Sequence, residues 1–151
     1  MMVWHYTIKQ RLDRILVDGL IKPATVFVPP NEKPVVWFSS NQIWEETANK
    51  ILQDSTGIRR GNKKETHEHG GGLARIGVAP EAAPYTWNDF KRLSGIQPKA
   101  AKLLYQAAIA GRARPGEWFV SFEAVSSKKW LAIELFDGTN WIPFDEKHKG
   151  R

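Results

Sequence analysis

The stretch Met2-Val3-Trp4-His5-Tyr6 predicts the first β-strand of the chain, because valine and aromatic residues favour a pleated, half-buried surface. Leucine and isoleucine side chains then recur at helical intervals between residues 12 and 20, which predicts a helix with one apolar face. Thr7 and Gln10 have the spacing of a capping box, so we expect this helix to begin at Thr7. Gly19 is a typical helix stop.

Residues 35–39 form a second apolar run, which predicts a strand that is buried on both faces. We expect a second helix directly after it, capped by Ser40 or Asn41 and carrying Glu45 and Glu46 in its first turn. The buried stripe of this helix is expected to contain Trp44, Ala48, Ile51 and Leu52.

The whole pattern predicts a fold of class α+β, with a mostly antiparallel sheet as core and helices flanking it. Asp137-Gly138 is typical of the hairpin turn that would join the last two strands. Residues 54–72 are polar, charged and rich in glycine, so we expect a flexible loop there. No change in composition divides the chain, and we expect a single domain over residues 1–151. The remaining expected strands lie at 73–79, 117–122, 130–136 and 141–144, and the remaining expected helices at 85–93 and 98–110.

Composition and charge narrow the classes of partner. The 22 Lys and Arg against 16 Asp and Glu give a formal net charge of +6, which favours anionic partners such as nucleotides or nucleic acid. The lack of cysteine excludes disulfides, thiolate zinc sites and cysteine nucleophiles. No apolar run approaches the ~20 residues that cross a bilayer, and the chain does not begin like a signal peptide. We therefore expect a cytoplasmic protein that acts away from membranes.

Local motifs give little support to metal or phosphate-loop chemistry. His67 and His69 lie with acidic neighbours in a glycine-rich stretch that has no clear ligand set, so we predict no metal site. Gly70-Gly71-Gly72 lacks the strand–helix context of a dinucleotide-binding loop, and no P-loop or nucleophile-elbow motif is present. The basic residues at 59–64 are interpreted as a solvated surface, with contact to phosphates as the alternative.

Three segments together resemble the ADP-ribosyltransferase superfamily, in the branch of the poly- and mono-ADP-ribosyl polymerases. Residues 3–7 look like its first strand, where a His-x-Ser/Thr motif holds the NAD nicotinamide and ribose. Residues 35–39 look like its second motif, in which an aromatic residue packs on the nicotinamide, and residues 116–122 look like its catalytic-glutamate strand. Trp37 stands where that branch usually has Tyr, and Tyr6 replaces a small residue. The resemblance implies a split, mostly antiparallel sheet with NAD as the substrate.

The resemblance also implies roles for individual side chains. His5 and Glu117 would be catalytic: His5 donates hydrogen bonds to the ribose hydroxyls, and Glu117 stabilises the cationic sugar of the transition state. Each also has a structural alternative. His5 would be a strand histidine that is hydrogen-bonded to the backbone, and Glu117 would be an exposed carboxylate on a strand. Thr7 equally fits a helix cap, and both Trp37 and Trp44 fit a hydrophobic core. The implied NAD-binding residues are His5, Tyr6, Thr7, Trp37, Phe38, Ser39 and Trp44.

The function that the resemblance implies is an NAD-dependent mono-ADP-ribosyltransferase, which transfers ADP-ribose to a protein or nucleic-acid acceptor. An RNA 2′-phosphotransferase of the same fold is one alternative. A catalytically inactive module that binds NAD or ADP-ribose is another, with Trp37 and Tyr6 filling the nicotinamide pocket. A basic nucleic-acid-binding domain is the alternative from a different class. Similar transferases include toxin-like proteins of bacteria or phages, which would imply an antitoxin or other neutralising partner.

Overall fold

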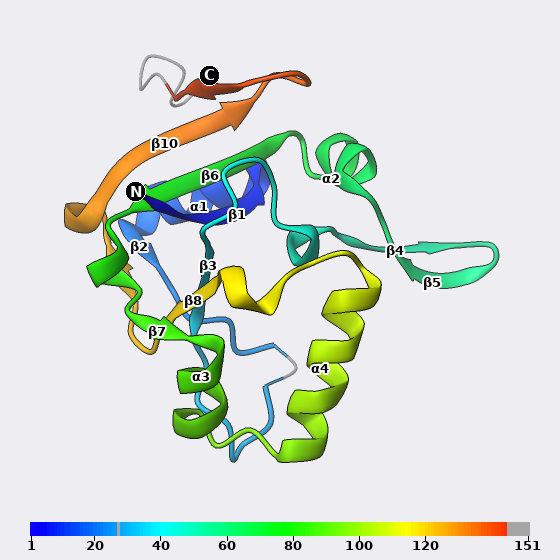
Figure 1. Ribbon diagram of the computed structural model, residues 1–151. Helices are drawn as coiled ribbons and strands as arrows, with labels where there is room; N and C mark the ends of the chain where they lie inside the picture. Colours follow the sequence, from blue (N-terminus) through cyan, green and yellow to red (C-terminus); the bar gives the residue numbers. More distant parts are fainter. Residues whose placement is uncertain (27, 145–151) are drawn as a thin grey trace.

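The computed structural model describes residues 1–26 and 28–144. A seven-stranded sheet forms the centre of an α+β fold (Figure 1), which confirms the predicted class. Every strand pairing in these residues is antiparallel. The strands lie in the order β11 (Trp141–Pro143), β10 (Trp130–Phe136), β6 (Leu73–Val78), β1 (Val3–Ile8), β3 (Val36–Ser39), β8 (Trp118–Ser121) and β7 (Tyr85–Thr86).

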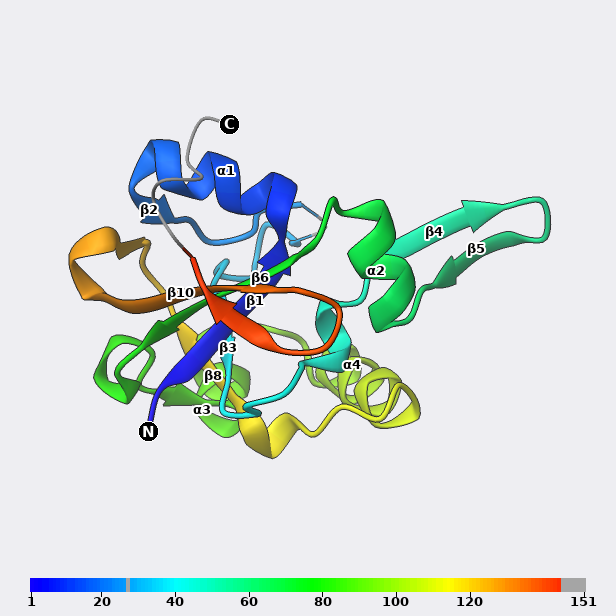
Figure 2. The ribbon, with the colours of Figure 1, turned by 90° about the horizontal axis from the view of Figure 1, so that it is seen from above.

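Helices and two short strand pairs surround the sheet. α1 lies on one side of it and α3 and α4 on the opposite side (Figure 2), while the hairpin of β4 and β5 projects away from the body of the protein. The helices are α1 (Lys9–Asp18), α2 (Lys63–His69), α3 (Trp87–Leu93) and α4 (Pro98–Ala110). The short pairs are β2 (Leu20–Ile21) with β9 (Val125–Ser126), and β4 (Ile51–Asp54) with β5 (Gly57–Arg60).

The hydrophobic core consists of three clusters on the two faces of the sheet. Leu12 of α1 packs with Val3 of β1 in the first cluster. Phe90 of α3 and Trp118 of β8 belong to the second. Trp4, the next residue along β1 after Val3, belongs to the third cluster. Successive side chains of β1 therefore alternate between the two faces, as a strand requires.

Arg75 of β6 is the polar centre of the third cluster, although the residue is only 7% exposed. Its guanidinium carbon lies 3.8 Å from the ring centre of Trp4 and 4.5 Å from that of Trp141. Its Nη2 donates a hydrogen bond of 2.5 Å to the carboxylate of Glu134 on β10. A buried charge is tolerated only when it is paired and hydrogen-bonded. Arg75 meets this condition by joining β1, β6, β10 and β11.

Arg75 also holds the segment that follows β3. Its Nη1 donates to the carbonyl oxygen of Gln42 at 2.6 Å and to the hydroxyl of Tyr6 at 3.1 Å. The Tyr6 hydroxyl in turn donates to the carbonyl oxygen of Asn41 at 2.5 Å. The backbone at residues 41–42 is thereby fixed to β1 and β6.

The first helix begins later than the sequence predicts. Thr7 stays in β1, whose pairing with β6 continues to Ile8, and α1 begins at Lys9. Ile8 is the N-cap and makes no side-chain capping bond, so the capping-box prediction for Thr7 and Gln10 is wrong. Gly19 ends α1 in the left-handed conformation, with φ 65°, as predicted.

A short 3₁₀ turn, Glu46–Ala48, stands where the sequence predicts a second helix, and β4 follows it. The carbonyl oxygens of Thr47 and Asn49, which a helix would use as its own acceptors, accept bonds from the Arg60 side chain at 3.1 and 3.0 Å. The helix prediction is therefore wrong. Ile51, expected in a buried stripe, lies on β4 and is 54% exposed.

Residues 54–72, where the sequence predicts a loop, contain the end of the β4–β5 hairpin and all of α2. Asn62 and Glu65 form a capping box that starts α2, a signal that the sequence carries. Arg59 of β5 bonds both Asp54, at 3.1 Å, and Glu65, at 3.0 Å and 2.5 Å. The loop prediction is wrong because these local hydrogen bonds and the capping box order the segment in spite of its polar composition.

The other elements lie close to their predicted positions. α4 and β10 have the predicted bounds, and Pro98 occupies the first turn of α4. α3 begins at Trp87, after the strand β7, with Thr86 as its N-cap. Asp137 accepts two backbone hydrogen bonds in the predicted turn between β10 and β11. The end of the expected domain, residues 145–151, lies outside the described residues.

Replacing Arg75 by methionine is expected to lower the free energy of unfolding by about 3 kcal/mol, because it leaves the carboxylate of Glu134 without its partner. Urea denaturation followed by tryptophan fluorescence measures this change. Arg92→Met is the matched control, because it removes an exposed ion pair with Asp89 and should hardly move the urea midpoint. Equal shifts in the two variants would contradict the anchoring role of Arg75.

Candidate functional site

A cleft of about 510 Å³ opens where β1 and β3 diverge. The two strands pair through Trp4 and Ser39, and beyond this point a side chain bridges them. Nδ1 of His5, on β1, lies 2.9 Å from the carbonyl oxygen of Trp37, on β3. The walls of the cleft also include residues from the loop before β3, the 3₁₀ turn after it, the start of β8 and the end of α4.

His5 is fixed to β3 through Nδ1, and its lowered pKa favours the neutral ring. A carbonyl oxygen only accepts, so Nδ1 carries the proton that is donated to Trp37. Burial lowers the pKa of His5 below its usual 6.5; the bond to Trp37 opposes this effect, and the positive charge of Arg11 adds to it. Nε2 of the neutral ring is therefore an acceptor for a ligand hydroxyl. The neutral ring would thus accept a hydrogen bond from a ribose hydroxyl, whereas the resemblance implies donation by His5.

An aromatic wall forms one side of the cleft. The ring of Trp37 is partly buried and lies 4.8 Å from that of Phe90 and 5.6 Å from that of Trp118, in an edge-on contact. All three residues line the cleft. Trp37 thus packs against the core, as its structural alternative predicts, and also offers an aromatic surface to a flat ligand ring.

Charged side chains of both signs border the cleft. The cations are Arg11 of α1, Lys33 of the preceding loop and Arg60 of β5, and the acids at its border include Glu32 and Glu46. Desolvation raises the pKa of Glu32. Guanidinium groups bind phosphate and carboxylate groups through several hydrogen bonds at once. The cationic side chains suit a ligand that carries phosphates.

Glu45 also lines this cleft, although the sequence predicts only a helix-turn role for it. The residue is 8% exposed. Its Oε2 accepts hydrogen bonds from Nε1 of Trp118 at 3.1 Å and from the backbone N and Oγ1 of Thr47 at 3.2 and 2.8 Å. No local pattern distinguishes Glu45 from Glu46, so sequence reasoning had no signal by which to select it.

Most of the residues predicted to bind NAD border this cleft, but not all through their polar groups. The hydroxyl of Tyr6 is bonded to Asn41 and Arg75, and burial raises its pKa to about 12. The predicted residues that line the cleft are His5, Tyr6, Trp37, Phe38 and Ser39. Tyr6 therefore supports the cleft and does not present a free hydroxyl to a ligand.

Thr7 and Trp44 do not belong to the walls of the cleft as the described residues define them. Thr7 is buried within the pairing of β1 with β6. Trp44 is 4% exposed, meets the ring of Tyr6 edge-on at 5.3 Å and donates from Nε1 to Asn49 at 3.0 Å. This position agrees with the structural alternative, in which Trp44 is part of the hydrophobic core.

Glu117 lies in a 3₁₀ turn, Pro115–Glu117, just before β8 and not within the strand as predicted. Its carbonyl oxygen accepts a bond from the backbone N of Ser40 at 2.9 Å, and its Oε1 lies 3.5 Å from Nδ2 of Asn41. The next residue, Trp118, lines the cleft, whereas Glu117 is not part of the wall that the described residues form.

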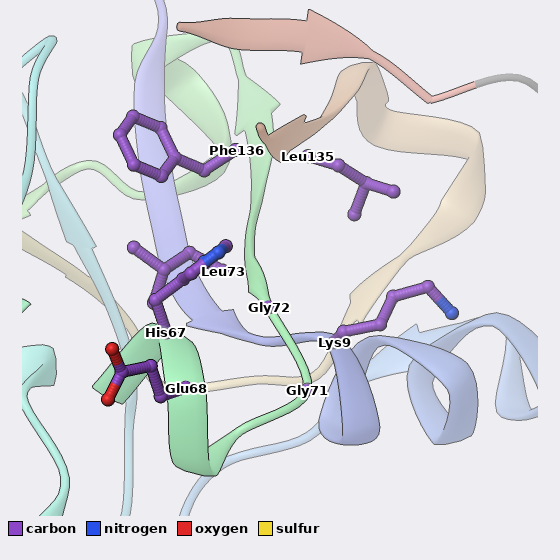
Figure 3. A pocket seen from close by; sticks show the side chains of 8 residues that line it. All are labelled: Lys9, His67, Glu68, Gly71, Gly72, Leu73, Leu135 and Phe136. Atoms are coloured by element: carbon purple, nitrogen blue, oxygen red, sulfur yellow. The ribbon is translucent and has the colours of Figure 1, made fainter. Parts of the chain in front are cut away.

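A second cavity, of about 450 Å³, lies between the start of α1, α2 and the end of β10 (Figure 3). His67 and Phe136 meet edge-on at 5.8 Å, and Nδ1 of His67 is buried without a hydrogen-bond partner among the described residues. Lys9, on its opposite side, is paired with Asp13. No residue that the sequence predicts for the site lines this cavity in the described structure, so we place the candidate site in the first cleft.

Across residues 1–26 and 28–144, no three His, Cys, Asp or Glu side chains come together to hold a metal ion. No helix in the same residues is long and apolar enough to span a bilayer. No family model, curated protein or solved structure matches the chain. The relationship to the ADP-ribosyltransferases therefore stays a resemblance of sequence motifs.

Below about pH 6.5 the unfolded chain binds a proton at His5 that the folded protein, with its lowered pKa, does not bind. The free energy of unfolding should therefore fall as the pH decreases from 6.5 toward the lowered pKa. His5→Gln is expected to remove this part of the slope, measured by urea denaturation at a series of pH values. His69→Gln, at an exposed position, serves as control and should keep the slope of the wild type.

Proposed function

We propose that the chain is an NAD-dependent mono-ADP-ribosyltransferase, which cleaves nicotinamide from NAD and transfers the ADP-ribosyl group to a protein or nucleic-acid acceptor. The observation that carries the proposal is the meeting of three features in one cleft: neutral His5, the aromatic ring of Trp37 and a set of cationic side chains. They match a ribose hydroxyl, the nicotinamide ring and the pyrophosphate of NAD.

The link between His5 and Trp37 supports this assignment. In NAD the nicotinamide ring and its ribose are joined by a single bond, so the groups that bind them must be neighbours. His5 and Trp37 are neighbours, because Nδ1 of His5 lies 2.9 Å from the backbone carbonyl oxygen of Trp37, and this bond fixes the position and tautomer of the imidazole. The divergence of β1 and β3 at this point also agrees with the split sheet that the resemblance implies.

The positive charge around the cleft supports a dinucleotide as ligand. Arg60 is held at two backbone carbonyls, so its guanidinium loses little further freedom when it binds a phosphate. Arg11 and Lys33 border the same space. The net charge of +6 favours an anionic acceptor such as nucleic acid or an acidic protein surface.

The proposal extends to the setting of the reaction. NAD is a cytoplasmic metabolite, so we place the protein in the cytoplasm. A toxin-like transferase acting there would require an antitoxin or another neutralising partner. The resemblance to toxin-like enzymes of bacteria and phages is the support for this part of the proposal.

Purified wild-type protein is expected to release nicotinamide from NAD, which chromatography quantifies. Trp37→Ala should weaken NAD binding about tenfold in calorimetry, because the aromatic contact to the nicotinamide is lost. The matched control is Tyr85→Ala, which removes an aromatic ring that packs on Phe122 and should leave the affinity unchanged.

The same measurements distinguish the alternative functions. Binding of NAD without nicotinamide release would favour an inactive binding module. Removal of the 2′-phosphate from an RNA that carries one would favour the phosphotransferase, provided that NAD is not cleaved when this RNA is left out. Salt-dependent binding of nucleic acid with no response to NAD would favour a basic binding domain and would contradict the proposal.

A further inference from the structure

Glu45 is a buried carboxylate with one oxygen fixed by hydrogen bonds and the other without a partner among the described residues. Three donor atoms, from Trp118 and Thr47, hold Oε2 at 2.8–3.2 Å. Within residues 1–26 and 28–144, no hydrogen bond reaches Oε1. This atom is not completely buried. Oε1 is therefore accessible, and Glu45 lines the cleft.

A carboxylate that is only 8% exposed calls for a physical reason, because buried acids are normally paired with cations. All three donors to Glu45 are neutral groups, and none of the ion pairs in the described part of the chain includes Glu45. The donors orient the carboxylate but leave its charge without a cationic partner. A ligand that develops positive charge in the cleft would supply one.

We propose that Glu45 is the catalytic carboxylate of this cleft, with Oε1 stabilising the positive charge that develops on the ribose. This inference rests on the proposed NAD chemistry. As the C1′–N bond breaks, both of its electrons pass to nicotinamide, which leaves as a neutral base. C1′ then carries the positive charge that faces Glu45. An acceptor hydroxyl or water forms the new bond to C1′ and gives its proton to solvent.

The geometry favours Glu45 over the other two candidate acids. Glu117, which the sequence motif predicts for this role, lies beside Asn41 and outside the walls of the cleft in the described structure. Glu46 also lines the cleft, but in the described residues its carboxylate is oriented by one hydrogen bond, from Nδ2 of Asn49 at 2.8 Å. A fixed charge stabilises a transition state best when no reorganisation is needed, and Oε2 of Glu45 has three orienting bonds.

Glu45→Gln is expected to lower kcat for nicotinamide release by about 100-fold, with little effect on the urea midpoint. Glutamine keeps the shape and an acceptor oxygen for Trp118 and Thr47, but removes the charge. Glu81→Gln, the same change at an exposed site, is the control and should keep the wild-type rate. Full activity in Glu45→Gln together with loss of activity in Glu117→Gln would overturn the assignment to Glu45.

Thr47→Val is a second variant that tests how Glu45 is positioned. It removes the 2.8 Å bond from Oγ1 to Oε2 but leaves the backbone donor and the carboxylate in place. We expect kcat to fall about fivefold with KM nearly unchanged. An unchanged kcat would contradict the role of these bonds in orienting the carboxylate.

Binding of a cationic sugar analogue separates this inference from the proposed function. An ADP derivative that carries a protonated pyrrolidine in place of the ribose should bind wild type about tenfold more tightly than its neutral ring analogue. Glu45→Gln should lose this preference. Preference for the cation with no NAD cleavage by wild type would refute the transferase, and with it the catalytic role of Glu45, and would leave Glu45 as a cation-binding carboxylate of the cleft. NAD cleavage by wild type with the preference intact in Glu45→Gln would refute Glu45 alone.

Discussion

The buried guanidinium of Arg75 is the constraint on which the rest of the structure depends. Its guanidinium carbon lies within 4.5 Å of the centres of two indole rings, and its charged N–H groups must find acceptors. It takes Glu134 on the adjacent strand, the hydroxyl of Tyr6 and the carbonyl oxygen of Gln42. Because the last of these acceptors is a backbone carbonyl, the hydrogen bonds of Arg75 also fix the course of the chain after β3. The segment that leads to the cleft is thus held from within the core.

This anchoring and the divergence of β1 and β3 together produce the cleft. Where two paired strands separate, their backbone groups lose their partners and need others. The imidazole of His5 supplies one of them by donating to the carbonyl of Trp37. The same bond stabilises the gap, selects the tautomer and leaves Nε2 as an acceptor for a ligand. One hydrogen bond thus provides the Trp37 carbonyl with a partner and determines the tautomer of His5.

Strands and helices whose apolar periodicity agrees with their tertiary environment could be predicted from the sequence, as the bounds of β10 and α4 illustrate. The start of α1 could not, because Thr7 satisfies a capping pattern while the pairing of β1 with β6 extends through it. Of the candidate site, the sequence pattern identified His5 and Trp37, which stand on strands. It gave phosphate contact only as the alternative role of Arg60, and it did not identify Glu45, whose bond from Trp118 is distant in sequence.

The wrong helix prediction and the missed carboxylate have a common physical cause. A continuous helix after Asn41 would have used the carbonyls of Thr47 and Asn49 internally, and Arg60 would have lost the acceptors that hold it at the cleft. With the helix replaced by a turn, the amide and hydroxyl of Thr47 are free to orient Glu45, and Trp118 reaches it from β8. Local propensity is overridden here in favour of fixed charges facing a cleft. Such a conflict between local and tertiary preference is expected at a functional site.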